Sequence, residues 1–203
     1  MTVLSYGAWR TNAELIADVA KLGYLDGRVL DLTFGEGKFC TYHRPRDLET
    51  NDLDEAKADW SFDVTSTVPE HWVDAFDSVV FDPPYRMSGR RDGRTALVDT
   101  SFDERFGLAE YTSPNDVLAL ISSGIQFAAG CVKPGGSILV KCQDQVCSGR
   151  KVWQSVHVHE VATILGLRVV DMFHLIQGNA RPQPSGRRQV HARSNASQLL
   201  VLR

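Results

Sequence analysis

Hydrophobic positions near the start of the chain recur at helical spacing. Thr11 is followed three residues later by Glu14, which matches a capping box, and Gly23 is a natural helix stop. Between them the apolar side chains lie three or four residues apart: Leu15, Ile16, Val19, Ala20 and Leu22. This pattern predicts an amphipathic helix between Thr11 and Gly23.

The rest of the chain alternates short apolar runs with further helical patterns. Runs rich in β-branched and aromatic residues predict strands at 28–32, 48–54, 60–64, 75–81, 137–141, 168–176 and 197–202. Helices are predicted at 113–130 and 152–165, and a turn at 133–136. Strands that alternate with helices are typical of an α/β, doubly wound, Rossmann-like sheet.

Composition is that of an ordinary globular protein. The 203 residues include 43% hydrophobic and 23% charged side chains, which suits one domain spanning residues 1–203. The net charge of -3 excludes a uniformly basic surface, although residues 179–203 carry arginines and no carboxylate.

Cysteine usage and the chain start bear on the compartment. The four cysteines form no CxxC pair, so we expect reduced thiols and no metal site. No signal pattern and no run of membrane-spanning length is present. These features predict a cytoplasmic protein that does not span a membrane.

The most distinctive stretch is the buried-type run Val79 to Phe81 followed by Asp82, Pro83, Pro84 and Tyr85. The prolines cannot donate to a sheet ladder, so the strand must end there. An acid, rigid carbonyls and an aromatic ring would then lie at the carboxyl end of a strand. In open α/β sheets this is where ligands bind.

A glycine-containing loop directly follows the first predicted strand. It runs from Thr33 through Phe34, Gly35 and Glu36 to Gly37, immediately after Asp31 and Leu32. Two glycines spaced by one residue allow a tight turn and a close approach of backbone to ligand. Because neither a third glycine nor a P-loop GK[ST] follows, the loop favours an uncharged or zwitterionic nucleoside ligand over a phosphate.

Acidic residues follow at the spacing found in nucleotide-binding βαβ units. Asp52 lies close to the ~20-residue distance at which an acid meets a ribose hydroxyl. Asp54 and Glu55 are competing candidates, and a solvated loop acid is the alternative.

The chain resembles class I S-adenosylmethionine-dependent amino-methyltransferases. The stretch from Val29 to Gly37 is similar to their cofactor loop, and Asp82-Pro83-Pro84-Tyr85 matches their (D/N/S)PP(Y/F) catalytic tetrad. Lys133-Pro134-Gly135-Gly136 before a strand is also typical of the class. The arginine-rich tail resembles that of small phage-type DNA methylases.

The resemblance implies a fold, a cofactor and site residues. The fold is a mostly parallel seven-stranded sheet whose last strand is antiparallel. S-adenosylmethionine is the implied cofactor, and its methionine part would lie along Asp31, Gly35 and Gly37. Thr33 and Phe34 are further expected cofactor contacts. Asp52 would bind the ribose, while Asp63 and Val64 would flank the adenine.

The tetrad suits methylation of an exocyclic amine, whose lone pair is delocalised into the base. The Asp82 carboxylate and the Pro83 carbonyl can each accept one N–H, and Tyr85 can stack on the base. Alignment for in-line transfer would then be the main contribution to catalysis. A base within a duplex must be flipped out to reach such a pocket.

Two basic segments are the candidates for nucleic-acid contact. A long loop at 86–113 reads as a lid or substrate loop, and a basic segment covers 178–196. Solvated charge is the alternative interpretation of both. The candidate contacts are Arg86, Arg90, Arg91, Arg187, Arg188, His191 and Arg193.

The sequence therefore favours a DNA methyltransferase acting on adenine N6. Methylation of cytosine N4 or of an RNA base remains open, as does a cofactor-binding partner subunit without catalysis. The recognition sequence and the oligomeric state are left undetermined.

Overall fold

The computed structural model of the chain describes residues 9–86, 113–176 and 190–203. Its α-helices are α1 (Asn12–Ala20), α3 (Pro114–Cys131) and α4 (Gln154–Ile164), with short 3-10 helices η1 (Lys38–Cys40) and η2 (Glu70–Trp72). Its strands are β1 (Arg28–Asp31), β2 (Asp47–Thr50), β3 (Phe76–Phe81), β4 (Val132–Cys142), β5 (Gln145–Cys147), β6 (Arg150–Val152), β7 (Val169–Ile176) and β8 (Ala196–Leu202).

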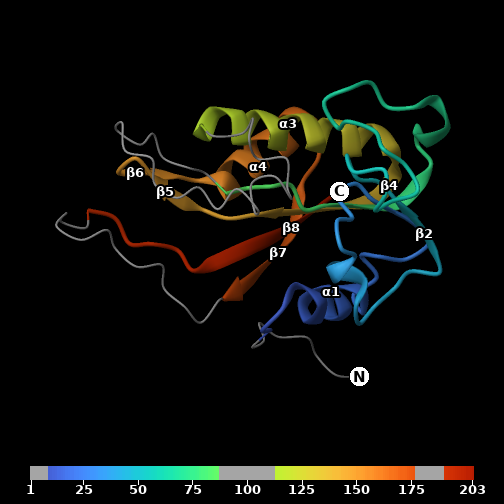
Figure 1. The fold of residues 1–203 in the computed structure, drawn as a ribbon, viewed down its shortest axis with the longest axis horizontal. Helices are drawn as coiled ribbons and strands as arrows, with labels where there is room; N and C mark the ends of the chain where they lie inside the picture. The colour runs from blue at the N-terminus through green and yellow to red at the C-terminus, as the bar shows by residue number, and fades with distance from the viewer. Residues whose placement is uncertain (1–8, 87–112, 177–189) are drawn as a thin grey trace.

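The main sheet has the strand order β2-β1-β3-β4-β8-β7. Strands β2, β1, β3 and β4 are mutually parallel, and β8 runs antiparallel between β4 and β7. Helices cover both faces, with α3 and α4 above the sheet and α1 below it in Figure 1. The α/β Rossmann-like class with an antiparallel last strand is therefore confirmed.

Alternation along the strands divides the core between the two faces. On β3, Val79 and Phe81 belong to the cluster that packs against α3 and α4, while Val80 belongs to the cluster against α1. On β4, Val140 and Leu139 divide in the same way. This is the pattern of strands buried on both faces, where side chains point alternately up and down.

The helix starts largely match their sequence signals. The Thr11 side chain accepts from the Glu14 amide at 3.2 Å, but the Glu14 carboxylate accepts from the Arg10 amide rather than from Thr11. A complete capping box forms instead at α3, where Ser113 and Asp116 satisfy each other's backbone amides. The predicted helix at 113–130 is thus confirmed.

The described residues place six strands in the main sheet, so the expected seventh strand is wrong. Residues 60–64 form only an isolated bridge from Trp60 to Asn51. The Asn51 side chain accepts from the Phe62 amide at 2.7 Å and donates to the Phe62 carbonyl at 3.0 Å. The Asn51 side chain therefore satisfies the Phe62 amide and carbonyl, which in a strand would bond to the backbone of a neighbouring strand.

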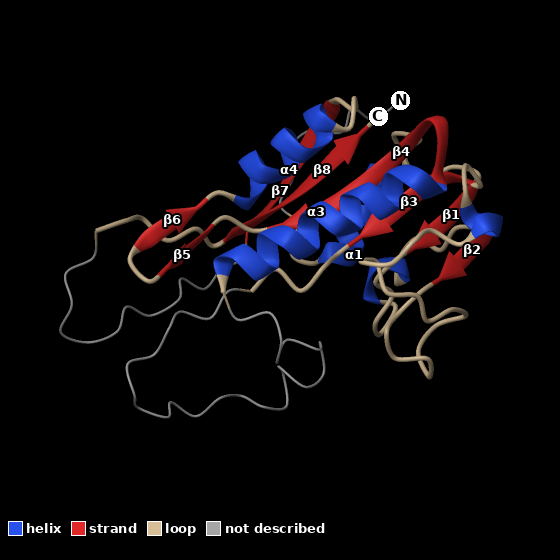
Figure 2. Ribbon diagram, turned by 90° about the horizontal axis from the view of Figure 1, so that it is seen from above, coloured by secondary structure: helices blue, strands red, loops and turns tan. Residues whose placement is uncertain are grey.

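Two other predictions change in detail. The expected turn at 133–136 is part of β4, where pairing with β3 shifts between Phe76 and Ser78 and leaves a bulge. The short antiparallel pair β5–β6 was not predicted, because three-residue strands carry too little pattern to detect. Figure 2 shows this hairpin projecting beyond the main sheet.

The structure also bears on the cysteines, on membrane-spanning helices and on metal-binding groups. All four cysteines are free, and Cys131, Cys142 and Cys147 are buried. In the part of the chain that the structure describes, no helix is both long and apolar enough to cross a membrane. The same residues contain no group of three or more side chains that could hold a metal ion.

Candidate functional site

The carboxyl ends of three neighbouring parallel strands meet at one edge of the sheet. Asp31 ends β1 opposite Val80 of β3, and Phe81 lies opposite Val140 of β4. The next residues along β3 and β4 are Asp82 and Lys141. Because the strands are parallel and in register, the three charged residues are gathered at the same edge.

The loop after β1 is held in shape by hydrogen bonds to Asp31 at the end of β1 and to the two residues that follow β2. The Thr33 amide donates to the Asp31 carboxylate at 3.1 Å, and the Phe34 amide donates to the Asn51 carbonyl at 3.0 Å. The Gly35 amide donates to Asp52 Oδ2 at 2.9 Å. The structure thus brings the glycine loop and Asp52 together, as the spacing predicted.

Both glycines of the loop have positive φ angles, 55° at Gly35 and 64° at Gly37. A Cβ on Gly37 would lie 2.8 Å from Phe34 Cζ, so any other residue would have to displace the Phe34 ring as well as adopt a positive φ. A Cβ on Gly35 would meet nothing closer than the Thr33 carbonyl oxygen at 4.0 Å. The loop is therefore tight beneath Gly37 and open beside Gly35.

Among the competing acids, Asp52 is the one tied to the loop. Its second oxygen, Oδ1, accepts from the Asp54 amide at 3.0 Å. Asp54 pairs instead with Lys57 at 3.1 Å, and its carboxylate caps the Ala56 amide. Geometry therefore favours Asp52 over Asp54 as a group facing a ligand in the loop.

The Asp-Pro-Pro-Tyr segment leaves β3 toward the same site. The Asp82 amide donates to Thr33 Oγ1 at 2.7 Å, which fixes the start of the segment to the glycine loop. Asp82 Oδ1 is buried and has no hydrogen-bond partner among the residues that the structure describes. A buried carboxylate oxygen without a donor is costly, so a donor from a ligand fits this position.

The carboxyl groups of the site have strongly raised pKa values. Burial raises the pKa of Asp31 to about 7, against the opposing hydrogen bond from Thr33 and with the help of the nearby acids Asp82 and Asp52. Burial raises the pKa of Asp82 to about 6, although the Lys141 ammonium acts in the opposite direction. Titratable groups perturbed in this way cluster at functional sites.

Lys141 is a charged residue in the core, with only 1% of its surface exposed. Its ammonium group donates to Asn12 Oδ1 at the start of α1 and lies 5.8 Å from the centroid of the Phe39 ring. Burial lowers the pKa of the Lys141 amine, while the Asp82 carboxylate raises it. Its proximity to Asp82 makes it part of the site.

The residues expected to flank an adenine are placed through Asn51. Asn51 is 1% exposed and donates to the Leu32 carbonyl at 3.1 Å as well as pairing with Phe62. Asp63 follows Phe62, and its carboxylate accepts from the Thr65 amide and hydroxyl, both at 2.8 Å. Val64 packs on the core beneath α3 and α4. Asn51 thus connects this segment to the strand that precedes the glycine loop.

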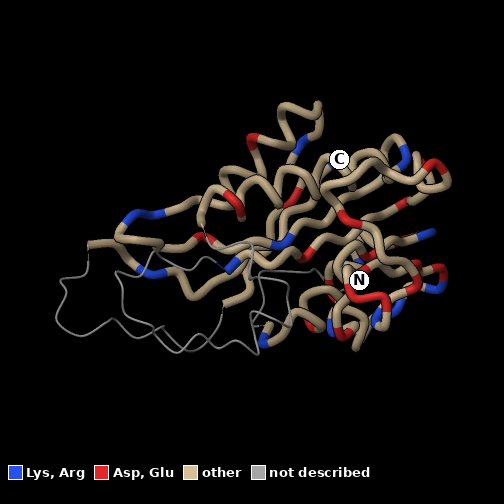
Figure 3. The backbone as a smooth tube through the Cα atoms, turned by 45° about the horizontal axis from the view of Figure 1, so that its top comes forward, with Lys and Arg blue, Asp and Glu red and all other residues tan. Residues whose placement is uncertain are grey.

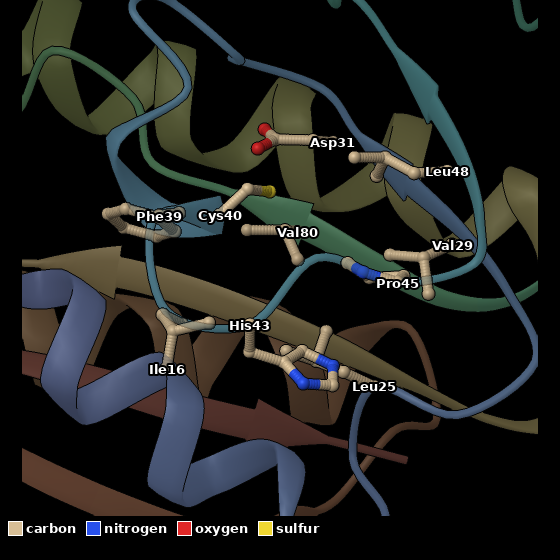
Figure 4. A pocket seen from close by; sticks show the side chains of 10 residues that line it. All are labelled: Ile16, Leu25, Val29, Asp31, Phe39, Cys40, His43, Pro45, Leu48 and Val80. Atoms are coloured by element: carbon tan, nitrogen blue, oxygen red, sulfur yellow. The ribbon is translucent and has the colours of Figure 1, made fainter.

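A separate small pocket lies on the α1 side of the sheet (Figure 4). Apart from Asp31, Cys40 and His43, its lining is apolar. Asp31 and His43 lie at opposite ends of it (Figure 4). Neither the tetrad nor Asp52 lines it, so this pocket shares only Asp31 with the site at the strand ends.

Comparison with known proteins identifies the fold. No protein-family model and no curated protein sequence matches the chain. The [4+2]-cyclase SpnF superposes with a TM-score of 0.54 at 14% identity, covering 99% of this chain and 88% of that one. A SAM-dependent methyltransferase from Leishmania major gives a TM-score of 0.52 at 14% identity, covering 95% and 72%. The chain has the class I methyltransferase fold.

Two further neighbours share the fold, and this chain covers different fractions of their lengths. TrmN from Thermus thermophilus gives a TM-score of 0.53 at 15% identity, covering 94% of this chain but only 47% of that one. The N-methyltransferase NodS from Bradyrhizobium japonicum WM9 gives 0.51 at 14% identity, covering 94% and 92%. Because one neighbour is a cyclase, the fold by itself does not determine the reaction.

The predicted nucleic-acid contacts are only partly within the described residues. Arg86 is exposed directly after the tetrad, His191 is partly exposed and Arg193 is exposed just before β8. Arg90, Arg91, Arg187 and Arg188 lie outside the described residues, as do most of the loop at 86–113 and much of the segment at 178–196.

Sequence reasoning missed four polar residues of the site: Asn51, Lys141, Gln145 and Gln154. Each is buried in the structure. Lys141 follows the apolar run of β4 and looks like a solvated strand end, while the others lie beside more conspicuous acids or aromatic residues. Their signal is burial, which a single sequence does not reveal for polar side chains.

Proposed function

We propose that this protein is an S-adenosylmethionine-dependent methyltransferase that acts on an exocyclic amino group of DNA, with adenine N6 as the first candidate. The observation that carries this proposal is the buried Asp82 Oδ1 beside the glycine loop, which has no partner within residues 9–86, 113–176 and 190–203. A pocket that only binds a nucleoside does not need an orphaned acceptor next to two rigid prolines.

The residues around the loop fit this cofactor. Gly35 leaves open space beside the backbone, and Gly37 allows the tight turn beneath it. Asp52 is fixed against the loop with lone pairs left to accept from ribose hydroxyls. Asp31 places a second carboxyl group below the loop, where a zwitterionic amino-acid group can bind. The bound cofactor would supply a sulfonium-activated methyl group.

Asp82 and Pro83 would prepare the amine for reaction. Each can accept one N–H, which draws the nitrogen toward tetrahedral geometry and directs its lone pair at the methyl group. The methyl group would pass from sulfur to nitrogen, so that the nitrogen–carbon bond forms as the sulfur–methyl bond breaks and the cofactor is left as a neutral thioether. The nitrogen would become positive in this step, and the Asp82 carboxylate would stabilise it. Asp82 is then placed to accept the proton that this nitrogen releases, and its pKa of about 6 suits that role at neutral pH.

Tyr85 and the basic residues would hold the rest of the substrate. The partly exposed Tyr85 can stack on a flipped or single-stranded base. Arg86, His191 and Arg193 are the described candidates for phosphate contacts. Strand β6 of the projecting hairpin carries two further basic residues, Arg150 and Lys151, and Figure 3 marks the Lys and Arg positions along the backbone in blue.

Asp82→Ala tests the proposal directly. Purified protein is incubated with methyl-labelled cofactor and with duplex DNA, single-stranded DNA or RNA, and the labelled nucleoside is then identified. The wild type should label adenine in DNA, and Asp82→Ala should reduce kcat at least about 100-fold, the scale expected when an interaction in the transition state is removed.

Other outcomes separate the alternatives. Label in cytosine or in RNA would change the substrate while keeping the reaction. Cofactor binding by calorimetry without label in any nucleic acid would favour a non-catalytic partner subunit. Full activity of Asp82→Ala would show that the tetrad has been assigned the wrong role.

A further inference from the structure

The backbone carbonyl of Tyr85 is held by two side-chain amides that come from later parts of the chain. Gln145 Nε2 donates to it at 2.9 Å and Gln154 Nε2 donates at 2.8 Å. Gln145 is the first residue of β5, and Gln154 is the first residue of α4. A carbonyl oxygen has two lone pairs, so these two donors saturate it.

The two glutamines are themselves buried and oriented. Gln154 is 0% exposed, and its Oε1 accepts from the Gln143 amide at 3.1 Å. With its oxygen engaged by that N–H, its nitrogen must face the Tyr85 carbonyl. Gln145 is 7% exposed.

Neighbouring contacts fix the start of α4 in the same position. The Asp144 carboxylate accepts from the Ser155 amide at 2.9 Å and from the Ser155 hydroxyl at 3.0 Å. Asp144 is 6% exposed. The segment 143–145 and the first turn of α4 therefore form one hydrogen-bonded unit against the tetrad.

Hydrogen bonds thus hold the tetrad at both ends. Thr33 accepts from the Asp82 amide at the first residue, and the glutamines donate to the carbonyl of the last. Pro83 and Pro84 between them have no amide to donate, so no sheet ladder can stabilise the segment. Hydrogen bonds with the side chains of Thr33, Gln145 and Gln154 therefore fix this segment in place of the backbone pairing that fixes a strand.

From this geometry we infer that Gln145 and Gln154 are positioning residues that set the place of Tyr85, and with it the base-stacking side of the site. The inference rests on the proposed function, because it assigns Tyr85 to substrate. Neither glutamine contacts the reacting atoms in this assignment. Removing their hydrogen bonds should change kcat or the KM for the nucleic acid, and it should leave the Kd for the cofactor unchanged.

The test replaces both donors by methionine, which keeps side-chain length and removes the hydrogen bonds. Gln145→Met/Gln154→Met should reduce kcat at least tenfold or raise the KM for DNA by as much, with the Kd for S-adenosylmethionine changed less than about twofold. Gln143→Met is the matched control, since Gln143 is buried and, among the described residues, joins this hydrogen-bonded unit only through its backbone amide. It should leave both parameters within about twofold of wild type.

A second readout does not depend on activity. The five tyrosines are replaced by 3-fluorotyrosine, and Tyr85→Phe identifies the Tyr85 fluorine resonance. The double variant should shift or split this resonance, whereas Gln143→Met should not. If the double variant does not fold, Gln145→Met alone is measured in the same way.

The outcomes are distinguishable. An unchanged Tyr85 resonance, or a shifted resonance with wild-type kcat and KM, overturns the positioning role. If the wild type itself methylates no nucleic acid, the proposed function fails, and the fluorine resonance still decides whether the glutamines hold Tyr85.

Discussion

At the scale of single residues, the site combines a buried ammonium group with a carboxylate oxygen that receives no hydrogen bond from the described part of the chain. Asp82 and Lys141 directly follow Phe81 and Val140, the last pair between β3 and β4. Burial disfavours the charged form of both groups, because it raises the pKa of Asp82 and lowers the pKa of Lys141. The opposite charge of each group shifts the pKa of the other in the reverse direction and so favours ionisation. Lys141 is therefore expected to keep Asp82 ionised in the pH range where the amine must be bound.

Lys141→Met should raise the pKa of Asp82, because the ammonium that lowers it is removed. If activity requires the Asp82 carboxylate, the acid limb of the kcat/KM profile should move to higher pH, by about one unit or more. The profile is measured between pH 5 and pH 9 for both proteins.

Lys133→Met provides a matched control at the other end of β4. Lys133 pairs with Asp77 at 2.8 Å and is partly exposed, so its loss should leave the acid limb in place. An unshifted limb in Lys141→Met would show that Lys141 does not influence Asp82.

At the scale of elements, the β5–β6 hairpin connects the site to a basic surface. Its first residue, Gln145, holds Tyr85, and the strand after the turn carries Arg150 and Lys151. The Lys151 ammonium lies 4.9 Å from the centroid of the Trp153 ring, and Trp153 is 55% exposed. Basic groups beside an exposed aromatic ring are suited to single-stranded nucleic acid.

Arg150→Gln/Lys151→Gln should weaken DNA binding about equally for all sequences. Loss of two phosphate contacts should make the slope of log K against log salt shallower by about two. Fluorescence anisotropy at several salt concentrations measures this slope.

Lys21→Gln serves as the control, since Lys21 ends α1 and is paired with Asp18 at 2.6 Å. It should leave the slope unchanged. Equal slopes for wild type and the hairpin variant would exclude the hairpin from phosphate contact.

At the scale of the whole molecule, the raised pKa values of Asp31 and Asp82 lower the free energy of unfolding at neutral pH relative to acidic pH. A carboxyl group whose pKa is raised by folding binds its proton more tightly in the native state than in the unfolded state. The free energy of unfolding therefore decreases as the pH rises from about 4 to the folded pKa, which is about 7 for Asp31 and about 6 for Asp82.

Asp31→Asn should remove much of this pH dependence. Asparagine keeps the oxygen that accepts from Thr33 and carries no charge to bury. At pH 8 the free energy of unfolding should rise by roughly 2–4 kcal/mol, since each pKa unit corresponds to about 1.4 kcal/mol. At pH 4 the variant and wild type should differ little. Urea unfolding at both pH values measures the difference, and equal stability at pH 8 would contradict the prediction.

The sequence alone determined the main elements and the order of the motifs. Periodic apolar positions identified α1, α3 and the strands that are buried on both faces, because core packing requires that pattern. Prolines and glycines marked the strand ends at Asp82 and Gly35, because backbone geometry restricts those residues locally. The position of the candidate site along the chain is therefore a prediction that local sequence alone can make.

Tertiary structure alone decided the partners of the polar residues. Asn51 takes the place of a strand ladder for Phe62, Lys141 is buried next to Asp82, and two glutamines from β5 and α4 meet at Tyr85. The residue type of a polar side chain does not show whether it is buried or solvated, because its burial depends on groups far away in the sequence. Long-range pairing, rather than local pattern, thus separates the site residues from ordinary surface residues.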